Sequence, residues 1–138
     1  MNHTFKIGDH QIEVDIDATR EFYTRQNKII DDCECQDCFY FHNDFINQPL
    51  NIFKILISFG IDIKKNLNSE PTGLWCIRNK NGQVSHLVQR FQLIGKLIQN
   101  KENYFILSSH DNGFKVSTSF SQSANNKIDI ELIIDETV

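Results

Sequence analysis

Glycine and proline are scarce in this sequence, with six and two copies among 138 residues. Fibrous repeats and long low-complexity segments need many more of both, so the composition excludes these classes. Hydrophobic residues make up 40% of the chain and include eleven phenylalanines, which supply enough apolar surface for a packed core. Since no repeat or linker interrupts the chain, we expect residues 1–138 to form a single domain.

The sequence also lacks a membrane-spanning run and a secretion signal. Its longest apolar segment, Ile52 to Ile63, is too short and too interrupted to cross a bilayer, and the first four residues begin no charged leader or hydrophobic stretch. Four cysteines in a chain without an export signal are expected to be reduced thiols or metal ligands. We therefore expect a cytoplasmic protein with no membrane partner.

A clustered basic surface is missing as well. The 14 lysines and arginines are scattered and are outnumbered by 18 aspartates and glutamates, which gives a net charge of −4. Nucleic-acid binding draws its affinity from grouped basic residues that displace counterions, so we expect no nucleic-acid partner. An acidic surface favours solubility, or a basic protein partner.

No complete catalytic motif is present. The sequence contains no Gly-x-Ser-x-Gly, no His-Glu-x-x-His and no phosphate-binding glycine loop. His86 and His110 could meet across the predicted sheet, but histidines on strands are more often half-exposed surface residues. The acidic run of Asp31, Asp32 and Glu34 fits a solvated helix entry better than an acid–base pair. The sequence therefore favours a noncatalytic protein.

The first half of the chain predicts a hairpin followed by helices. A Gly8-Asp9 turn between two alternating segments predicts a β-hairpin over residues 3–16. Asp17 is the expected N-cap of a helix over residues 18–27. Two more helices are expected, the second apolar on most sides and therefore deeply buried: Gln36 to Asn47, and Pro49 to Gly60.

The second half predicts strands, separated by turn sequences typical of antiparallel hairpins. The segments are Gly73–Arg78, Gln83–Gln99, Tyr104–His110, Phe114–Ser121 and Lys127–Ile134. The long second segment is interpreted as one bent strand or two, with Gly95 at a bulge. Its aromatic residues and those of its neighbours are expected to be core rather than a ligand groove: Trp75, Phe91, Phe105, Phe114 and Phe120. The predicted fold class is α+β, with the N-terminal hairpin and short helices packed on an antiparallel β-meander sheet.

The most concentrated chemical feature is residues 33–38, Cys-Glu-Cys-Gln-Asp-Cys. Three thiolates this close together can bind one zinc ion if the chain reverses between them. His42 lies four residues after Cys38, on the same face of the predicted helix, and completes a predicted metal site of Cys33, Cys35, Cys38 and His42. Cys76, on the first strand of the sheet, is the alternative fourth ligand.

Two other interpretations of the cysteines stay open. Free cysteines are among the most buried residues, so these thiols could simply fill small apolar spaces. Cys35-x-x-Cys38 at a helix start could be a redox pair, because the helix dipole lowers the pKa of the first thiol. No βαβ pattern surrounds the motif, which argues against a thioredoxin-like architecture.

Residues 31–40, Asp-Asp-Cys-Glu-Cys-Gln-Asp-Cys-Phe-Tyr, resemble a family of uncharacterised bacterial proteins with a Cys-x-Cys-x-x-Cys motif followed by aromatic residues. The likeness continues in residues 56–62, Leu-Ile-Ser-Phe-Gly-Ile-Asp, and weakens in the C-terminal strands, where Ile133 and Ile134 replace the family's Pro-Trp. The resemblance implies a bacterial source and an intact domain. It implies no activity, because none is known for the family.

The sequence thus predicts a noncatalytic binding or interaction domain with a protein partner, in which the cysteine cluster holds a structural zinc. One alternative is an acidic immunity-type inhibitor that masks a basic site on a toxin, since complementary charge gives fast and specific docking. The other alternative is a thiol-based redox protein.

Overall fold

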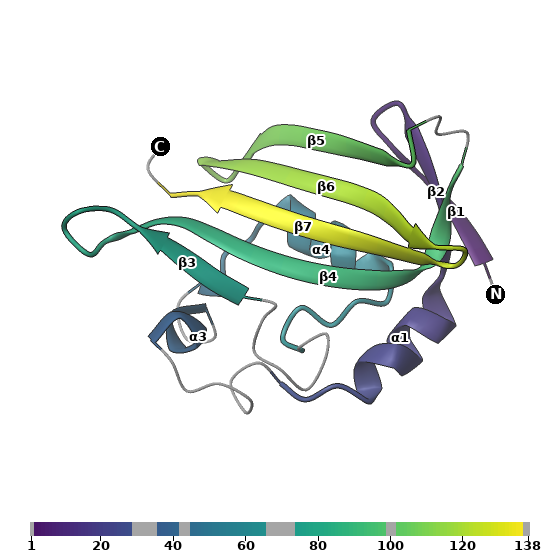
Figure 1. The fold of residues 1–138 in the computed structure, drawn as a ribbon, viewed down its shortest axis with the longest axis horizontal. Helices are drawn as coiled ribbons and strands as arrows, with labels where there is room; N and C mark the ends of the chain where they lie inside the picture. The colour runs from purple at the N-terminus through teal and green to yellow at the C-terminus, as the bar shows by residue number, and fades with distance from the viewer. Residues whose placement is uncertain (1, 29–35, 42–44, 66–73, 99–101, 137–138) are drawn as a thin grey trace.

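The computed structural model describes residues 2–28, 36–41, 45–65, 74–98 and 102–136. The helices are α1 (Ile16–Thr24), α3 (Gln36–Tyr40) and α4 (Asn51–Ser58). The strands are β1 (Asn2–Ile7), β2 (His10–Asp15), β3 (Leu74–Arg78), β4 (Val84–Ile98), β5 (Tyr104–Asp111), β6 (Phe114–Ala124) and β7 (Lys127–Asp135). The described residues have a fold that is roughly α+β but mainly β: an open sheet of seven antiparallel strands, with α4 behind it and α1 and α3 below it in Figure 1.

The strand order is β1-β2-β4-β7-β6-β5, and β3 pairs with β4 beside β2. β5, β6 and β7 form the expected meander, but the expectation that it extends back to β4 is wrong. β5 lies at the far edge of the sheet, and β7 takes the place next to β4. The physical reason is visible in β7, whose Ile128, Ile130, Leu132 and Ile134 are all at most 1% exposed. A central position buries this row of large side chains, whereas an edge would leave it open to water.

β4 is one continuous strand of 15 residues that changes partner along its length. Its first half pairs with β3 and its last four residues pair with β2. In the gap between them, the N–H groups of Gln92 and Ile94 donate to the hydroxyls of Tyr23 and Thr19 of α1, both at 3.0 Å. Gly95 therefore marks the start of the pairing with β2 rather than the expected bulge.

The helices differ from the sequence prediction in three ways. α1 begins earlier, because Asp15 rather than Asp17 accepts the capping bond from Ala18 N–H at 3.0 Å. α3 ends at Tyr40, so only part of the predicted helix over 36–47 is α-helical in the described residues. α4 ends as expected before Gly60, whose φ is +92°. However, Ile57 of α4 is 53% exposed, because an eight-residue helix packs only one face on the sheet.

The first turn of α4 is capped from a distance. Leu50 offers no side-chain hydrogen bond at this position. Instead, the buried carboxylate of Asp111, at the end of β5, accepts the N–H groups of Asn51 and Ile52 at 2.9 and 3.0 Å. Charged acceptors stabilise helix N-termini, so Asp111 fixes α4 on the sheet.

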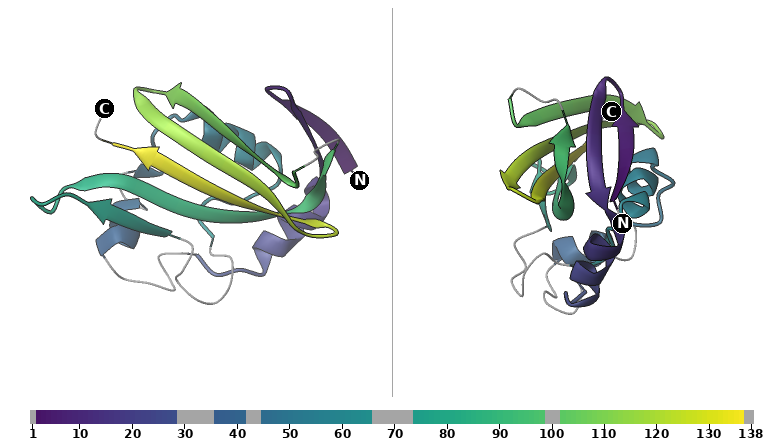
Figure 2. Two further views of the ribbon diagram at one scale, coloured as in Figure 1. Left: turned by 45° about the horizontal axis from the view of Figure 1, so that its top comes forward. Right: turned by 90° about the vertical axis from the view of Figure 1, so that its right-hand side faces the viewer.

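The predicted core is largely confirmed. Phe91, Phe105 and Phe120 are buried, and the last two rings stack at 4.7 Å. Trp75 and Phe114 are partly buried. Figure 2 shows the β1–β2 hairpin standing across one end of the sheet, where the ring of His10 stacks on Phe105 with centroids 4.1 Å apart. Among the described residues, no helix has the length and apolar character needed to cross a membrane.

Candidate functional site

The predicted metal ligands are mostly outside the part of the chain that the structure describes. Cys33, Cys35 and His42 lie outside the described residues, and for Cys38 only the backbone, in α3, is described. The metal site thus stays a prediction. Within the described ranges, no group of three or more histidine, cysteine or acidic side chains is placed to hold a metal ion.

Within the cysteine segment, residues 33–38, the carboxylate of Asp37 joins α3 to β3. We call this contact the Asp37 clasp. Asp37 lies in the first turn of α3, beside Cys38. One carboxylate oxygen accepts the backbone N–H of Cys76 at 3.1 Å, and the other accepts the guanidinium of Arg78 at 2.6 Å. The alternative fourth ligand, Cys76, therefore lies on the strand that is tied directly to the helix carrying Cys38.

The thiol of Cys76 is held in its protonated form. Burial is the largest cause, followed by the negative charge of Asp37, and together they raise the pKa of Cys76 to about 12, although Arg78 opposes them. Because the thiolate is the nucleophile, a thiol with this pKa is inert at neutral pH. Cys76 in this structure does not fit the reactive thiol of a redox protein.

This protonation predicts slow alkylation of Cys76. At pH 8 it should hold about three orders of magnitude less thiolate than an ordinary cysteine, so iodoacetamide should label it correspondingly slowly. Asp37→Asn should speed the labelling, because it removes a charge that disfavours the thiolate. Mass spectrometry of the Cys76 peptide measures both rates, with Asp129→Asn as a control on the outer sheet surface. Labelling at the rate of a free thiol in the unmodified protein would contradict the prediction.

A second polar pair joins α3 to the end of β7. The Tyr40 hydroxyl donates to one oxygen of Glu136, while the other oxygen is buried and has no hydrogen-bond partner among the described residues. Burial raises the pKa of Glu136 above its ordinary value, and the bond from Tyr40 and the proximity of His86 lower it in part. The carboxylate is thus more costly to ionise in the folded chain than in the unfolded chain.

This pKa shift predicts a pH-dependent effect of Glu136→Gln. Because the folded pKa is higher than the unfolded one, the carboxyl stabilises the fold fully below the unfolded pKa, and this contribution is lost as pH rises through the folded pKa. Glutamine does not titrate, so the stability of the variant relative to wild type should increase as the pH rises above about 4, the ordinary pKa of a glutamate. Denaturant unfolding followed by the fluorescence of Trp75 measures this difference. A change of the same size in Glu21→Gln, on the exposed face of α1, would contradict it.

A serine, a histidine and an aspartate meet near this pair but do not make a catalytic triad. His86 contacts the Ser85 hydroxyl at 3.0 Å and Asp135 at 3.6 Å. However, the Ser85 hydroxyl is buried and donates to the carbonyl of Ile77 at 3.0 Å, so its proton does not face His86. The suggested meeting of His86 with His110 is wrong, because β7 and β6 lie between their strands.

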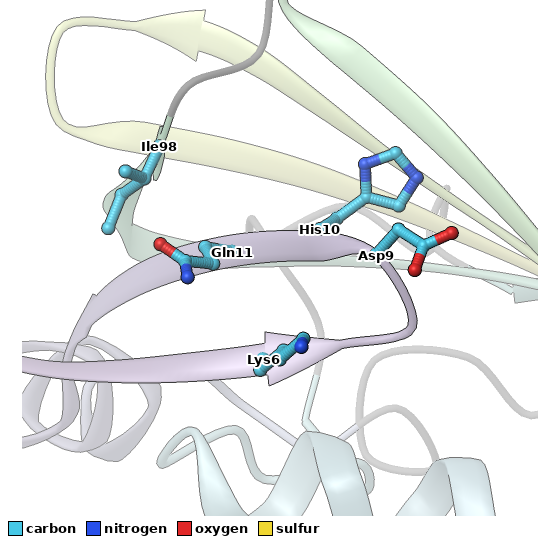
Figure 3. Close-up of a pocket in the computed structure, with 5 residues that line it drawn as sticks. All are labelled: Lys6, Asp9, His10, Gln11 and Ile98. Carbon is cyan, nitrogen blue, oxygen red and sulfur yellow. The ribbon is translucent and has the colours of Figure 1, made fainter.

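A small polar pocket of about 230 Å³ lies beside the β1–β2 hairpin and the end of β4 (Figure 3). Lys6, Gln11 and Ile98 occupy one row across three strands. In Figure 3, Asp9 and His10 lie nearer the turn of the hairpin than this row. The polar groups do not converge on one point, so the pocket offers no acid–base pair for catalysis.

A larger groove of about 540 Å³ lies between α1, residues 46 and 47 before α4, the end of α4 and the turn that follows it. Its apolar wall includes Ile46, Ile57 and Ile61, and two basic residues, Arg20 and Lys64, line the same space. We call it the Ile57 groove. Of the hollows described here, it combines the most apolar surface with charged groups, which is typical of ligand sites.

Comparisons with protein-family models, curated proteins and solved structures found no match. The site is therefore interpreted from its own residues. The sequence indicates Cys76 as a candidate ligand, but it does not reveal the contacts made by Asp37, Arg78, Tyr40 and Glu136. The one signal that pointed to Asp37 was its place in the first turn of a helix, where carboxylates are common.

Proposed function

We propose that the protein is a noncatalytic binding domain of the cytoplasm, whose cysteine segment holds a structural zinc ion. The proposed ligands are those predicted from the sequence: Cys33, Cys35, Cys38 and His42, with Cys76 as the alternative to His42. Three thiols and an imidazole, or four thiols, match the ligand sets that zinc prefers in closed structural sites. Zinc would stabilise this segment, which is dense in polar residues and poor in apolar ones.

The observation that supports this proposal is the Asp37 clasp. α3 has five residues, and so short a helix does not hold its shape alone. Asp37 attaches its first turn to β3 through two hydrogen bonds, one to Cys76 and one to Arg78. The cysteine segment that leads into α3 thus ends at a fixed point on the sheet, next to a further thiol. A fixed point of this kind favours the preformed geometry of a structural metal site.

The noncatalytic part of the proposal is supported by how the polar groups of the described residues are used. Asp37 is occupied by Cys76 and Arg78, and Tyr40 by Glu136. The protonated, partly buried thiol of Cys76 and the buried hydroxyl of Ser85 are both unsuited to attack a substrate. The hydrogen bonds of Asp37 and Tyr40 connect α3 to β3 and to the end of β7, so these side chains have a structural role.

The test is the zinc content of untagged protein purified under reducing conditions. We expect about one zinc per chain by elemental mass spectrometry. Cys38→Ser should lower this to less than about 0.1 zinc per chain, since it removes a proposed ligand. Cys76→Ser distinguishes the two candidates for the fourth ligand. The variant should keep its zinc if His42 is the fourth ligand and lose it if Cys76 is. A wild-type protein with less than about 0.1 zinc per chain would contradict the proposal.

A further inference from the structure

We propose that the Ile57 groove binds small aliphatic carboxylates, with the apolar tail on the isoleucines and the carboxylate between Arg20 and Lys64. This inference goes beyond the zinc-supported domain and uses none of its cysteines. It rests on the shape of the groove, on an apolar side chain left open to water, and on two basic side chains that have no acidic partner among the described residues.

The groove has the size and position of a small-molecule site. Its volume of about 540 Å³ lies within the range of 300–1,000 Å³ common for such sites. Its walls come from α1, from residues 46 and 47 before α4, from the end of α4 and from the turn that follows. The contact between α1 and that turn is close, since a Cβ added to Gly60 would lie 2.6 Å from the carbonyl of Ile16 and 3.2 Å from the backbone N of Arg20. Arg20 is therefore held by the backbone at one side of the groove.

Ile57 of α4 is the exposed part of the apolar wall. Ile52, Phe53 and Leu56 of this helix are buried, whereas Ile57 is 53% exposed and faces the groove with Ile46 and Ile61. Covering an aliphatic side chain with an aliphatic ligand releases water and is favourable in proportion to the area covered. The exposed fraction of Ile57 is thus the part of the wall that a ligand would gain most from covering.

The charges of the groove select the other end of the ligand. Neither Arg20 nor Lys64 forms a side-chain hydrogen bond or an ion pair with any of the described residues. The third charged residue, Asp62, accepts the backbone N–H of Lys64 at 3.0 Å. Two basic residues against one acidic residue leave one positive charge in excess, on a chain whose net charge is −4. That excess matches a single carboxylate, to which an arginine side chain offers two parallel donors.

The same residues argue against a phosphate as the ligand. A dianion would match the single excess positive charge of the groove less well than a monoanion, because it would leave one negative charge uncompensated beside Asp62. Inorganic phosphate also has no apolar part to cover Ile57. An aliphatic monocarboxylate satisfies both the isoleucines and the basic residues.

The test uses the full chain with its cysteines intact, and decanoate as the probe. Isoleucine methyl groups labelled with 13C are followed by NMR during the titration. We expect saturable shifts at Ile46, Ile57 and Ile61. 1-Decanol, which has the same tail and no charge, should bind at least about fivefold more weakly.

The matched variants separate the two halves of the proposal. Arg20→Gln and Lys64→Gln should each weaken decanoate binding by about fivefold to tenfold, whereas Lys54→Gln, on α4 outside the groove, should leave it unchanged. Ile57→Asn should weaken decanoate and decanol alike. Equal binding of decanoate and decanol would overturn the proposal. So would shifts spread evenly over the isoleucines of the sheet. The absence of any shift at about 1 mM decanoate would also overturn it, because about 1 mM is roughly the weakest dissociation constant expected of a specific ligand.

Discussion

Gly95→Ala is expected to destabilise the protein by about 3 kcal/mol. An added Cβ at this position would lie 2.1 Å from the carbonyl oxygen of Glu13 and 2.9 Å from Leu93. The nearer obstacle is the backbone of β2, which cannot move aside without breaking its pairing with β4 between Gln11 and Val14. Glycine is required here by space, because the two strands approach each other too closely for any side chain.

Gly82→Ala is the control for this prediction. Gly82 has a positive φ of +78°, but nothing lies within 4 Å of an added Cβ. Alanine there should lose only about 1 kcal/mol, from backbone strain alone. Guanidinium unfolding, followed by the fluorescence of the single tryptophan, Trp75, gives both free energies of unfolding. A Gly95→Ala protein as stable as the Gly82→Ala protein would show that β2 and β4 are farther apart than described.

Asp111→Ala is the second large expected effect, a loss of about 2–4 kcal/mol. The substitution leaves the N–H groups of Asn51 and Ile52 without their acceptor, and the second of these bonds is buried. Asp111→Asn should recover part of the loss, because an amide oxygen can accept one of the two bonds. The destabilisation should also be localised. In Asp111→Ala, hydrogen exchange at the amides of Asn51 and Ile52 should become faster by a larger factor than exchange in β7.

Asp129→Ala is the matched control for Asp111→Ala. Asp129 lies on the exposed side of β7 and accepts a single bond from Gln92 at 2.8 Å. Its removal should change the free energy of unfolding by less than about 0.5–1 kcal/mol, as for other exposed polar pairs. Similar losses in the two alanine variants would mean that Asp111 does not hold α4 to the sheet.

The helices and strands could be predicted from the sequence wherever the residues between them are characteristic of a turn. Asn112 and Gly113 adopt positive φ values of 51° and 84°, which these two residues tolerate well, and they join β5 to β6 as expected. The partner of a strand is not a local property. The alternation that made Lys127–Ile134 a clear strand contained no information that it would pair with β4, since any strand with an apolar face can occupy a central place.

The same limit applies to the contacts that fix the helices. The cap of α4 comes from Asp111, about 60 residues away in the chain, so no pattern near Asn51 could reveal it. At the candidate site, the prediction that Cys76 lies on a strand is confirmed, but this strand is β3, the third in a sheet that also contains the N-terminal hairpin. The sequence could not show that Asp37 reaches this strand, because hydrogen bonds between distant segments depend on the packing of α3 against β3.

The position of β7 has a consequence for how the chain folds during synthesis. β7 pairs along nearly its whole length with both β4 and β6, so it joins the two halves of the sheet. A nascent chain that has emerged only as far as β6 holds β4 on one side and the β5–β6 hairpin on the other, with no strand to connect them. The ribosome must therefore release residues 127–135 before the core around Phe91 and Phe120 can close. Until then, the apolar faces of β4 and β6 are exposed to other chains and to chaperones.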